Sequence, residues 1–328
     1  MSRIRMDEGL LLFDRDEHSF AIVSDMDRSS RDPERFVWRS LLRRGTLLQM
    51  RNGRYRIRWG DELLLQSNTA KHNRSMELSE LVLFGHKLLA MCDYTGLIFK
   101  IDTNDIAAGK KPKVLQRWAI ADGDGNSVKP CKMEWATVKD GELFVGSVGK
   151  EWTSNDGSTI EHRDPEWVKT IGQNGRVRNI NWGPVYGAIR KATNTSLATG
   201  GWLWHEAVHW DPRSRRWFFL PRKESQDVAY IPGQNEARCS NLLITVSEDF
   251  QDIKVTRIGP LEPKRGFTAL RKVPGTADVF MALKVKEADG EMKTWATVFN
   301  LNGDLLLEPD PFEFVADVKY EGLEFFPW

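Results

Sequence analysis

Short hydrophobic runs, alternating or aliphatic, follow one another along most of the chain and are separated by turn-forming pairs. Four such runs are Leu143–Val148, Trp217–Leu220, Val279–Leu283 and Thr294–Asn300. The turn signals between runs are Asn52-Gly53, Gly85-His86, Asp140-Gly141, Asp211-Pro212, Pro274-Gly275 and Asn302-Gly303. Strand-like runs at short spacing with few helical patterns predict an all-β sandwich, barrel or propeller.

One polar position recurs before these strand-like hairpins and favours the propeller. The five residues at this position are Ser79, Glu134, Glu206, Thr268 and Glu321, separated by 55, 72, 62 and 53 residues. A structural unit repeated at that period predicts the blades of a β-propeller, here five. If each blade directs one oxygen at the axis, five oxygens converge, and such a cluster requires a hard cation.

We expect one domain over residues 1–328, because no linker or change of composition divides the chain. Residues 1–19 form either an N-terminal extension or part of the blade that the C-terminal strand completes. A helix is predicted after the first strand, with Asp32 as cap, Pro33 as first helical residue and Gly45 as stop.

That predicted helix lies in an arginine-rich stretch, which we interpret as a solvated helix face, with a docking patch as the open alternative. Its arginines are Arg28, Arg31, Arg35, Arg39, Arg43 and Arg44.

Composition narrows the function classes. The formal net charge of +1 provides no basic surplus, so we do not expect a nucleic-acid partner. No run of about 18 apolar residues is present, so no membrane span is expected. Acidic residues flank the short apolar run 10–13, and we therefore expect no signal peptide in this sequence. Three cysteines form neither a disulfide framework nor a zinc ribbon.

Two metal-binding patterns are present but lie in the wrong context. His205-Glu206-Ala-Val-His209 matches the HExxH pattern of zinc peptidases, which needs a helix. On the strand predicted here, the two histidines lie about 13 Å apart, too far for one ion. Asp122–Asn126 resembles the start of an EF-hand loop, but Ser127 and Met133 replace the glycine and glutamate that the pattern requires.

The sequence allows two interpretations for each of two segments. The turn Asp122–Asn126 is either an exposed acidic turn or a contact to substrate or metal-bound water. The long polar segment Gly149–Lys169 is either a salt-bridged surface loop or a functional loop.

Several ordered motifs identify a resemblance that covers residues 20–326. MELSEL, DGDG…EWATVKD, GKEWT…DPEWVK, the His-Glu strand followed by RRWFFLPR, and KYEGLEF closely resemble the calcium-activated nucleotidase (apyrase) family. The resemblance implies a five-bladed propeller with Ca²⁺ on its axis. By motif, the implied calcium ligands are the five recurrent residues, with Thr268 of GFT standing where relatives have serine: Ser79, Glu134, Glu206, Thr268 and Glu321.

The resemblance also implies the activity, which is hydrolysis of the terminal phosphate of nucleoside diphosphates, such as UDP and GDP, and of triphosphates. The catalytic carboxylates map to Asp25 in VSDMD and Asp93 in CDYTG. Relatives often have arginine where Tyr94 stands. The implied substrate-binding candidates are cationic or aromatic, the latter for stacking on the base: Arg74, Lys150, Arg222, Trp135 and Trp152.

The sequence therefore predicts a calcium-dependent hydrolase in which Asp25 or Asp93 deprotonates a water while cationic side chains offset phosphate charge. The partners are nucleoside di- and triphosphates, with no nucleic acid and no membrane span, and a homodimer is an open alternative to a monomer. The family resemblance implies a secreted or lumenal location. The alternatives are a non-catalytic, calcium-stabilised propeller that acts as a binding module, and a zinc peptidase.

Overall fold

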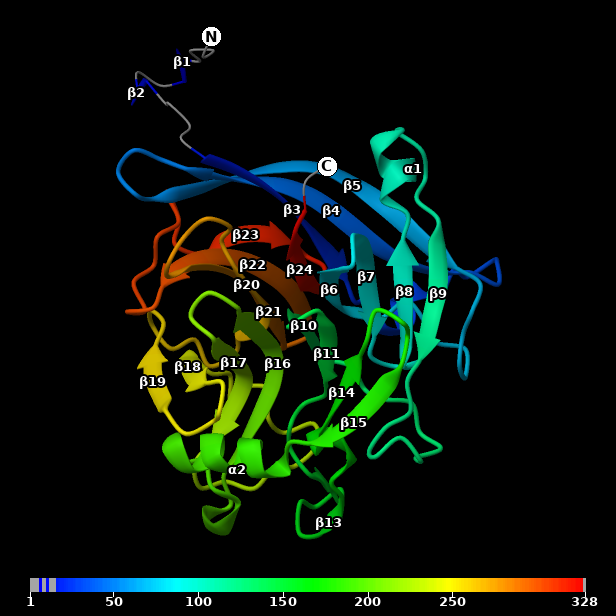
Figure 1. The fold of residues 1–328 in the computed structure, drawn as a ribbon, viewed down its shortest axis with the longest axis vertical. Helices are drawn as coiled ribbons and strands as arrows, with labels where there is room; N and C mark the ends of the chain where they lie inside the picture. Colours follow the sequence, from blue (N-terminus) through cyan, green and yellow to red (C-terminus); the bar gives the residue numbers. More distant parts are fainter. Residues whose placement is uncertain (1–5, 8–9, 12–15, 327–328) are drawn as a thin grey trace.

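The computed structural model of the protein describes residues 6–7, 10–11 and 16–326, and its strands form a five-bladed β-propeller (Figure 1). Each blade is a four-stranded antiparallel sheet, and in four of the five sheets the strands follow chain order. The fold class predicted from the recurrent polar residues is confirmed.

The strands of the first two blades come from residues 78–181. The first blade contains β6 (Leu78–Phe84), β7 (Lys87–Cys92), β8 (Leu97–Ile101) and β9 (Val114–Ala119). The second contains β10 (Trp135–Lys139), β11 (Glu142–Gly146), β14 (Trp167–Ile171) and β15 (Val177–Asn181).

The third and fourth blades come from residues 202–316. The third contains β16 (Trp202–Asp211), β17 (Arg216–Ser225), β18 (Leu242–Ser247) and β19 (Ile253–Arg257). The fourth contains β20 (Gly266–Lys272), β21 (Val279–Ala288), β22 (Glu291–Asn300) and β23 (Glu313–Ala316).

The fifth blade joins the two ends of the chain. It contains β24 (Tyr320–Phe325), β3 (Asp16–Ser24), β4 (Trp38–Gln49) and β5 (Tyr55–Ser67). The C-terminal strand β24 pairs with the N-terminal strand β3, with Phe325 opposite Phe20. This pairing closes the ring by backbone hydrogen bonds, and Figure 1 shows β24 between β3 and the centre of the ring.

Few elements lie outside the blades. The helices are α1 (Thr103–Ala107) and α2 (Gly183–Ala192), and 3-10 turns cover 27–30, 164–166 and 197–199. Two small hairpins pair β1 (Met6–Asp7) with β2 (Leu10–Leu11) and β12 (Trp152–Thr153) with β13 (Ile160–His162). Among the described residues, no helix is long and apolar enough to cross a membrane.

The turn predictions are confirmed, because each of the six glycine or proline signals lies at or beside a turn between strands. The helix predicted from Asp32 to Gly45 is wrong. Asp32 does accept backbone N–H bonds, from Glu34 at 3.0 Å and Arg35 at 3.1 Å, but the turn it caps leads into β4. Burial in β4 alternates with period two, as in a strand.

Apolar side chains fill the spaces between neighbouring blades and fix the strands that reach the axis. Between the second and third blades, Trp135, Trp182, Trp210 and Trp217 share one buried cluster. Many of the thirteen tryptophans therefore belong to the core, as aromatic residues on pleated surfaces often do.

Candidate active site at the propeller axis

The first strands of the five blades pack against one another around the axis, and a β-bulge in four of them leaves one residue out of the register. In β6, Leu78 pairs with Cys92 and Glu80 with Met91, so Ser79 is left out of the register. A bulge re-aims its extra residue and bends the strand. The same register shift occurs at Glu206, Thr268 and Glu321.

In the remaining first strand, Glu134 directly precedes β10, and its backbone N–H donates to the carbonyl of Gly146 at 2.9 Å. Four of the five recurrent residues therefore lie at a bulge of the innermost strand, and Glu134 lies just before the start of its strand. We call the five residues Ser79, Glu134, Glu206, Thr268 and Glu321 the axial ring.

Contacts between blades bring the axial ring together. The Ser79 hydroxyl donates to the carbonyl of Met133, the residue before Glu134. The Thr268 hydroxyl likewise donates to the carbonyl of Tyr320, at 3.4 Å, the residue before Glu321. Two equivalent bonds therefore join a ring hydroxyl to the backbone beside the ring glutamate of the next blade.

The carboxylate side of the ring is joined through Arg222. Its Nη1 atom lies 2.8 Å from Glu206 Oε2 and 3.3 Å from Glu321 Oε1. The fifth blade also approaches the first blade closely. A Cβ atom at Gly322 would lie 2.6 Å from backbone atoms of Glu80 and Leu81. Only glycine permits that approach of β24 to β6.

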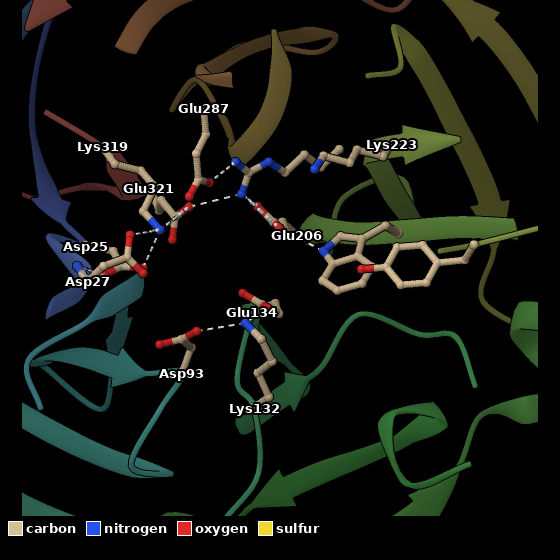
Figure 2. A pocket seen from close by; sticks show the side chains of 13 residues that line it. Asp25, Asp27, Asp93, Lys132, Glu134, Glu206, Lys223, Glu287, Lys319 and Glu321 are labelled. Atoms are coloured by element: carbon tan, nitrogen blue, oxygen red, sulfur yellow. Dashed lines mark hydrogen bonds and ion pairs between the residues drawn. The ribbon is translucent and has the colours of Figure 1, made fainter. Parts of the chain in front are cut away.

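The ring glutamates line a cavity of about 210 Å³ in which acidic groups outnumber cationic groups (Figure 2). The carboxylates in its wall are Asp25, Asp27, Asp93, Glu134, Glu206, Glu287 and Glu321. The cations are Lys132, Lys223, Lys319 and Arg222. Full ionisation of these seven acids and four bases leaves three negative charges, which favours a bound cation.

The pKa values in the ring reflect this surplus. Burial, together with the charges of Glu206 and Asp93, raises the pKa of Glu134 to about 8 despite the opposing charge of Lys132. Burial also raises the pKa of Glu321 well above its ordinary value, although Lys319 opposes the shift. The donor set consists of three carboxylates and two hydroxyls, which are hard oxygen ligands. The ring residues therefore fit a hard divalent cation such as Ca²⁺.

The two predicted catalytic carboxylates lie in the wall of the same cavity, with pKa values shifted in opposite directions. Burial opposes ionisation of Asp25, but Lys319, 2.7 Å away, outweighs it and lowers the pKa of Asp25. Burial raises the pKa of Asp93, and Lys132, at 2.7 Å, compensates only in part. The Oδ1 atom of Asp93 is buried without a hydrogen-bond partner among the described residues.

A wider groove of about 560 Å³ adjoins the cavity and shares Asp27, Asp93 and Lys132 with it. Arg74 and Trp152 also line this groove. We call it the outer groove.

Two predicted substrate-binding residues line the outer groove. The Arg74 guanidinium lies 3.9 Å from the centroid of the Tyr94 ring. Trp152 is 37% exposed and stacks on His162 with the rings 13° from parallel. An exposed aromatic face beside a charged cavity is suited to hold a base while the phosphates reach inward.

The prediction that Trp135 stacks on the base is wrong. Trp135 is fully buried, packs on Trp182, and donates its indole N–H to the carbonyl of Ser147 at 3.0 Å. The contact of Lys150 with substrate is not supported either, because its side chain is buried and its ammonium donates to the Glu151 carbonyl at 2.5 Å. Burial lowers the pKa of Lys150 to about 8.

The fifth predicted substrate-binding residue, Arg222, lies within the axial cavity. In addition to the two ring glutamates, it contacts Glu287 at 2.9 Å. All of these partners are carboxylates, so its guanidinium offsets protein charge in the described structure.

Sequence reasoning missed Lys132 and Lys319, although a signal for both is present. Each lysine stands two residues before a ring glutamate, in Lys132-Met-Glu134 and Lys319-Tyr-Glu321. Trp204 holds the same position before Glu206, and its indole N–H donates to that carboxylate at 2.8 Å. Residues two apart share a face of a strand, so the repeated spacing could have placed these side chains in the cavity.

The other motifs have simple structural roles. His205 and His209 lie on β16, as expected, and the helix that zinc-peptidase chemistry requires is absent there. His205 stacks on Tyr186 in the core. In the turn 122–126, Asp124 accepts the N–H of Asn126 at 2.9 Å. Asp122 belongs to the outer groove, and the segment 149–169 contributes Trp152 to it.

A second acidic group lies beside the cavity. Asp25, Asp27 and Glu77 each offer an oxygen, and these atoms lie within 4.8 Å of one another. Lys319 pairs with Asp25 and Asp27, while Arg74 pairs with Glu77, so side chains of the protein already offset this group.

Comparison with known proteins agrees with this geometry. The family model described as Apyrase matches residues 26–326. The soluble calcium-activated nucleotidase 1 of Rattus norvegicus is 38% identical over 94% of this chain and 73% of its own length. The apyrase of Cimex lectularius is 40% identical over 93% and 81%. Apyrase apy-1 of Caenorhabditis elegans is 37% identical over 94% and 84%.

Proposed function

The chain belongs to the apyrase family, and from that premise we propose that it hydrolyses the terminal phosphate of nucleoside di- and triphosphates in a calcium-dependent reaction. The observation that carries the proposal is the axial cavity. It joins a surplus of carboxylates at the ring to an outer groove that offers a cationic and an aromatic side chain. Nucleoside diphosphates such as UDP and GDP are the proposed preferred substrates.

The axial ring comprises the residues that would hold calcium: Ser79, Glu134, Glu206, Thr268 and Glu321. When bound, calcium supplies two positive charges that offset the charge on phosphate oxygens. Thr268 offers the same hydroxyl oxygen as the serine of relatives, and its side chain is fully buried at the ring.

Other residues of the cavity and of the outer groove are suited to bind the nucleotide and to activate the attacking water. Asp25 has a lowered pKa and is ionised at neutral pH, so it is suited to accept a proton from an attacking water. Asp93 has an unpartnered buried oxygen and is suited to orient that water. Lys132 and Arg74 offer cationic contacts to phosphate, Arg222 is a further cation of the cavity, and Trp152 offers its face to the base.

The direct test is phosphate release from UDP with calcium and its loss on addition of a chelator. A rate series over UDP, GDP, ADP and the triphosphates defines the substrate preference. If calcium protects the protein against heat but no nucleotide releases phosphate, the proposal fails and the non-catalytic binding module is correct.

We also propose a secreted or lumenal location, as the family resemblance implies. Fractionation of cells that express the full-length gene product tests it, and recovery in the cytosol would contradict it. A homodimer is proposed as the alternative to a monomer, and light scattering of the purified protein distinguishes the two.

A further inference from the structure

A pocket of about 440 Å³ adjoins the outer groove and contains cationic and neutral polar groups but no carboxylate in its lining. Its residues are Arg28, Arg31, His72, Asn73, Arg74 and Tyr94. Arg74 and Tyr94 belong to the outer groove as well, so the two hollows adjoin. We call it the arginine pocket.

The cationic charge of the arginine pocket comes from Arg28 and Arg31. Arg74 is already paired, with its Nε atom 2.8 Å from Glu77 and its Nη2 atom 3.7 Å from Asp27. Among the residues that the structure describes, neither Arg28 nor Arg31 forms an ion pair. Both are exposed, and no described carboxylate lies within 4.0 Å of either guanidinium.

Three other arginines of the same stretch, Arg39, Arg43 and Arg44, are engaged elsewhere, the last with Asp61 at 2.6 Å. Arg39 lies 3.5 Å from Asp32, and Arg43 donates to the carbonyl of Val315 at 2.8 Å. The structure thus divides the arginine-rich stretch and leaves two unpaired guanidinium groups at one pocket.

A tight turn with a left-handed backbone forms another part of the pocket wall. The backbones of Lys71 and Arg74 exchange hydrogen bonds of 3.0 and 2.9 Å around His72 and Asn73. The φ angles of His72 and Asn73 are 46° and 63°, a left-handed conformation that such turns usually assign to asparagine and glycine. The indole N–H of buried Trp38 fixes the Asn73 carbonyl at 3.2 Å. Strain that the surroundings maintain is common at binding sites.

We propose that the arginine pocket is a second oxyanion site, which binds a phosphate group through Arg28 and Arg31. The guanidinium fork matches two phosphate oxygens, and neutral donors from Asn73 and Tyr94 complete the site. The phosphate is either free inorganic phosphate or part of a nucleotide whose other end occupies the outer groove. Only the second source rests on the proposed function.

The test is a calorimetric titration of inorganic phosphate into the protein in chelator at constant ionic strength. Without calcium, the axial cavity carries negative charge and repels phosphate, so saturable binding reports on the arginine pocket. Replacement of both residues, Arg28→Gln with Arg31→Gln, is expected to weaken the affinity at least about tenfold, because two charge-assisted contacts are lost.

The matched control is Arg35→Gln, an exposed arginine of the same stretch outside the pocket, which is expected to leave phosphate affinity unchanged. Absence of saturable phosphate binding overturns the proposal. Equal affinity in the wild-type protein and the double variant also overturns it. Circular dichroism of the double variant confirms that these exposed replacements preserve the fold.

Inhibition of UDP hydrolysis by phosphate distinguishes the two sources. If the double variant raises KM for UDP and weakens phosphate inhibition, the pocket binds the phosphate chain of the nucleotide. If only the inhibition weakens, the pocket binds free phosphate. Unchanged KM together with unchanged inhibition contradicts both. The calorimetric result does not depend on turnover, so it stands or fails separately from the proposed hydrolase activity.

Discussion

Two layers of charged residues lie along the same innermost strands, and they compensate their buried charge in different ways. The first is the axial ring. The second, which we call the inner cluster, consists of Glu80, Arg271 and Glu324. Arg271 and Glu324 each follow a ring residue by three positions on the same strand, about 10 Å along the axis.

The inner cluster is compensated by the protein itself. Arg271 lies 3.2 Å from both Glu80 and Glu324, and it donates to the carbonyls of Leu81 at 2.6 Å and Ala136 at 3.2 Å. One guanidinium therefore joins β20 to β6, β10 and β24, the innermost strands of four blades. Both glutamates also accept backbone N–H bonds, for example from Leu81 at 2.8 Å to Glu80.

Among the described residues, no backbone N–H donates to the carboxylate of a ring glutamate. The ring glutamates contact the side chains of Lys132, Lys319, Arg222 and Trp204 instead. A carboxylate held by backbone donors is fixed by the fold, whereas one held by long side chains can exchange its partners. The inner cluster is therefore suited to hold the blades together, and the axial ring is suited to take a cation from solution.

The largest effects are expected from two variants of the cavity, one that removes a metal ligand and one that removes a catalytic group. Glu134→Ala removes a charged ring oxygen, so we expect both calcium-linked stabilisation and UDP turnover to be lost. Asp93→Asn should retain the calcium effect and lower turnover by about 100-fold or more, because a neutral amide replaces the carboxylate that is proposed to orient the attacking water. Steady-state rates and thermal unfolding with and without calcium measure both, and full activity of Asp93→Asn would refute its assigned role.

Removal of Arg271 tests the other half of the comparison. Arg271→Ala leaves two buried carboxylates without their cation, so we expect a loss of about 3–5 kcal/mol in the free energy of unfolding. Urea unfolding in chelator measures the loss. As a control, Arg271→Met combined with Glu80→Gln and Glu324→Gln should recover much of it, because no buried charge remains. A change below about 1 kcal/mol would contradict the proposed role.

Calcium should stabilise the folded protein through the ring alone. At a free concentration of one hundred times Kd, the expected gain in unfolding free energy is about 2.7 kcal/mol, as for any ligand specific for the folded state. The gain should vanish in Glu206→Gln and persist in the Arg271 variant. An equal gain in all three proteins would show that the ion binds elsewhere.

The smallest expected effect is on the pH dependence of stability, and it comes from His209 near Arg271 of the inner cluster. Burial, together with the nearby charges of Arg271 and Lys272, lowers the pKa of His209 to about 3, with Asp211 opposing. Between pH 6.5 and 3 the unfolded chain therefore binds a proton that the folded protein does not, so this contribution to stability is lost as pH falls. The slope is at most about 1.4 kcal/mol per pH unit.

His209→Gln removes that titration. Urea unfolding at pH 7 and pH 5 in chelator should show a smaller loss of stability for the variant than for the wild-type protein. Equal losses in the two proteins would mean that His209 is protonated in the folded state.

The fold and the ring positions were predictable because they depend on repetition. Each blade must place one innermost strand at the axis, so a polar residue that recurs before five strand-like runs indicates five equivalent positions. The bulges at Ser79, Glu206, Thr268 and Glu321 were not predicted, because a bulge depends on register against the neighbouring strand.

The errors arose where local sequence competes with tertiary context. Asp32 and Pro33 form a good helix start, yet the buried alternation from Trp38 onward fits only a strand against β3. Trp135 is as aromatic as Trp152, but sequence alone does not show that it faces Trp182 in the core. Arg271 and Glu80 are 191 residues apart, so their contact follows only from ring closure.

Direct measurement of bound calcium in two matched variants tests the central claim most sharply. Glu321 and Glu324 lie on the same strand, three residues apart, one in each layer. Calorimetric titration of calcium should give one tightly bound ion per chain in the wild-type protein and in Glu324→Gln, and none in Glu321→Gln. Calcium binding that survives in Glu321→Gln and is lost in Glu324→Gln would contradict the assignment of the cation to the axial ring.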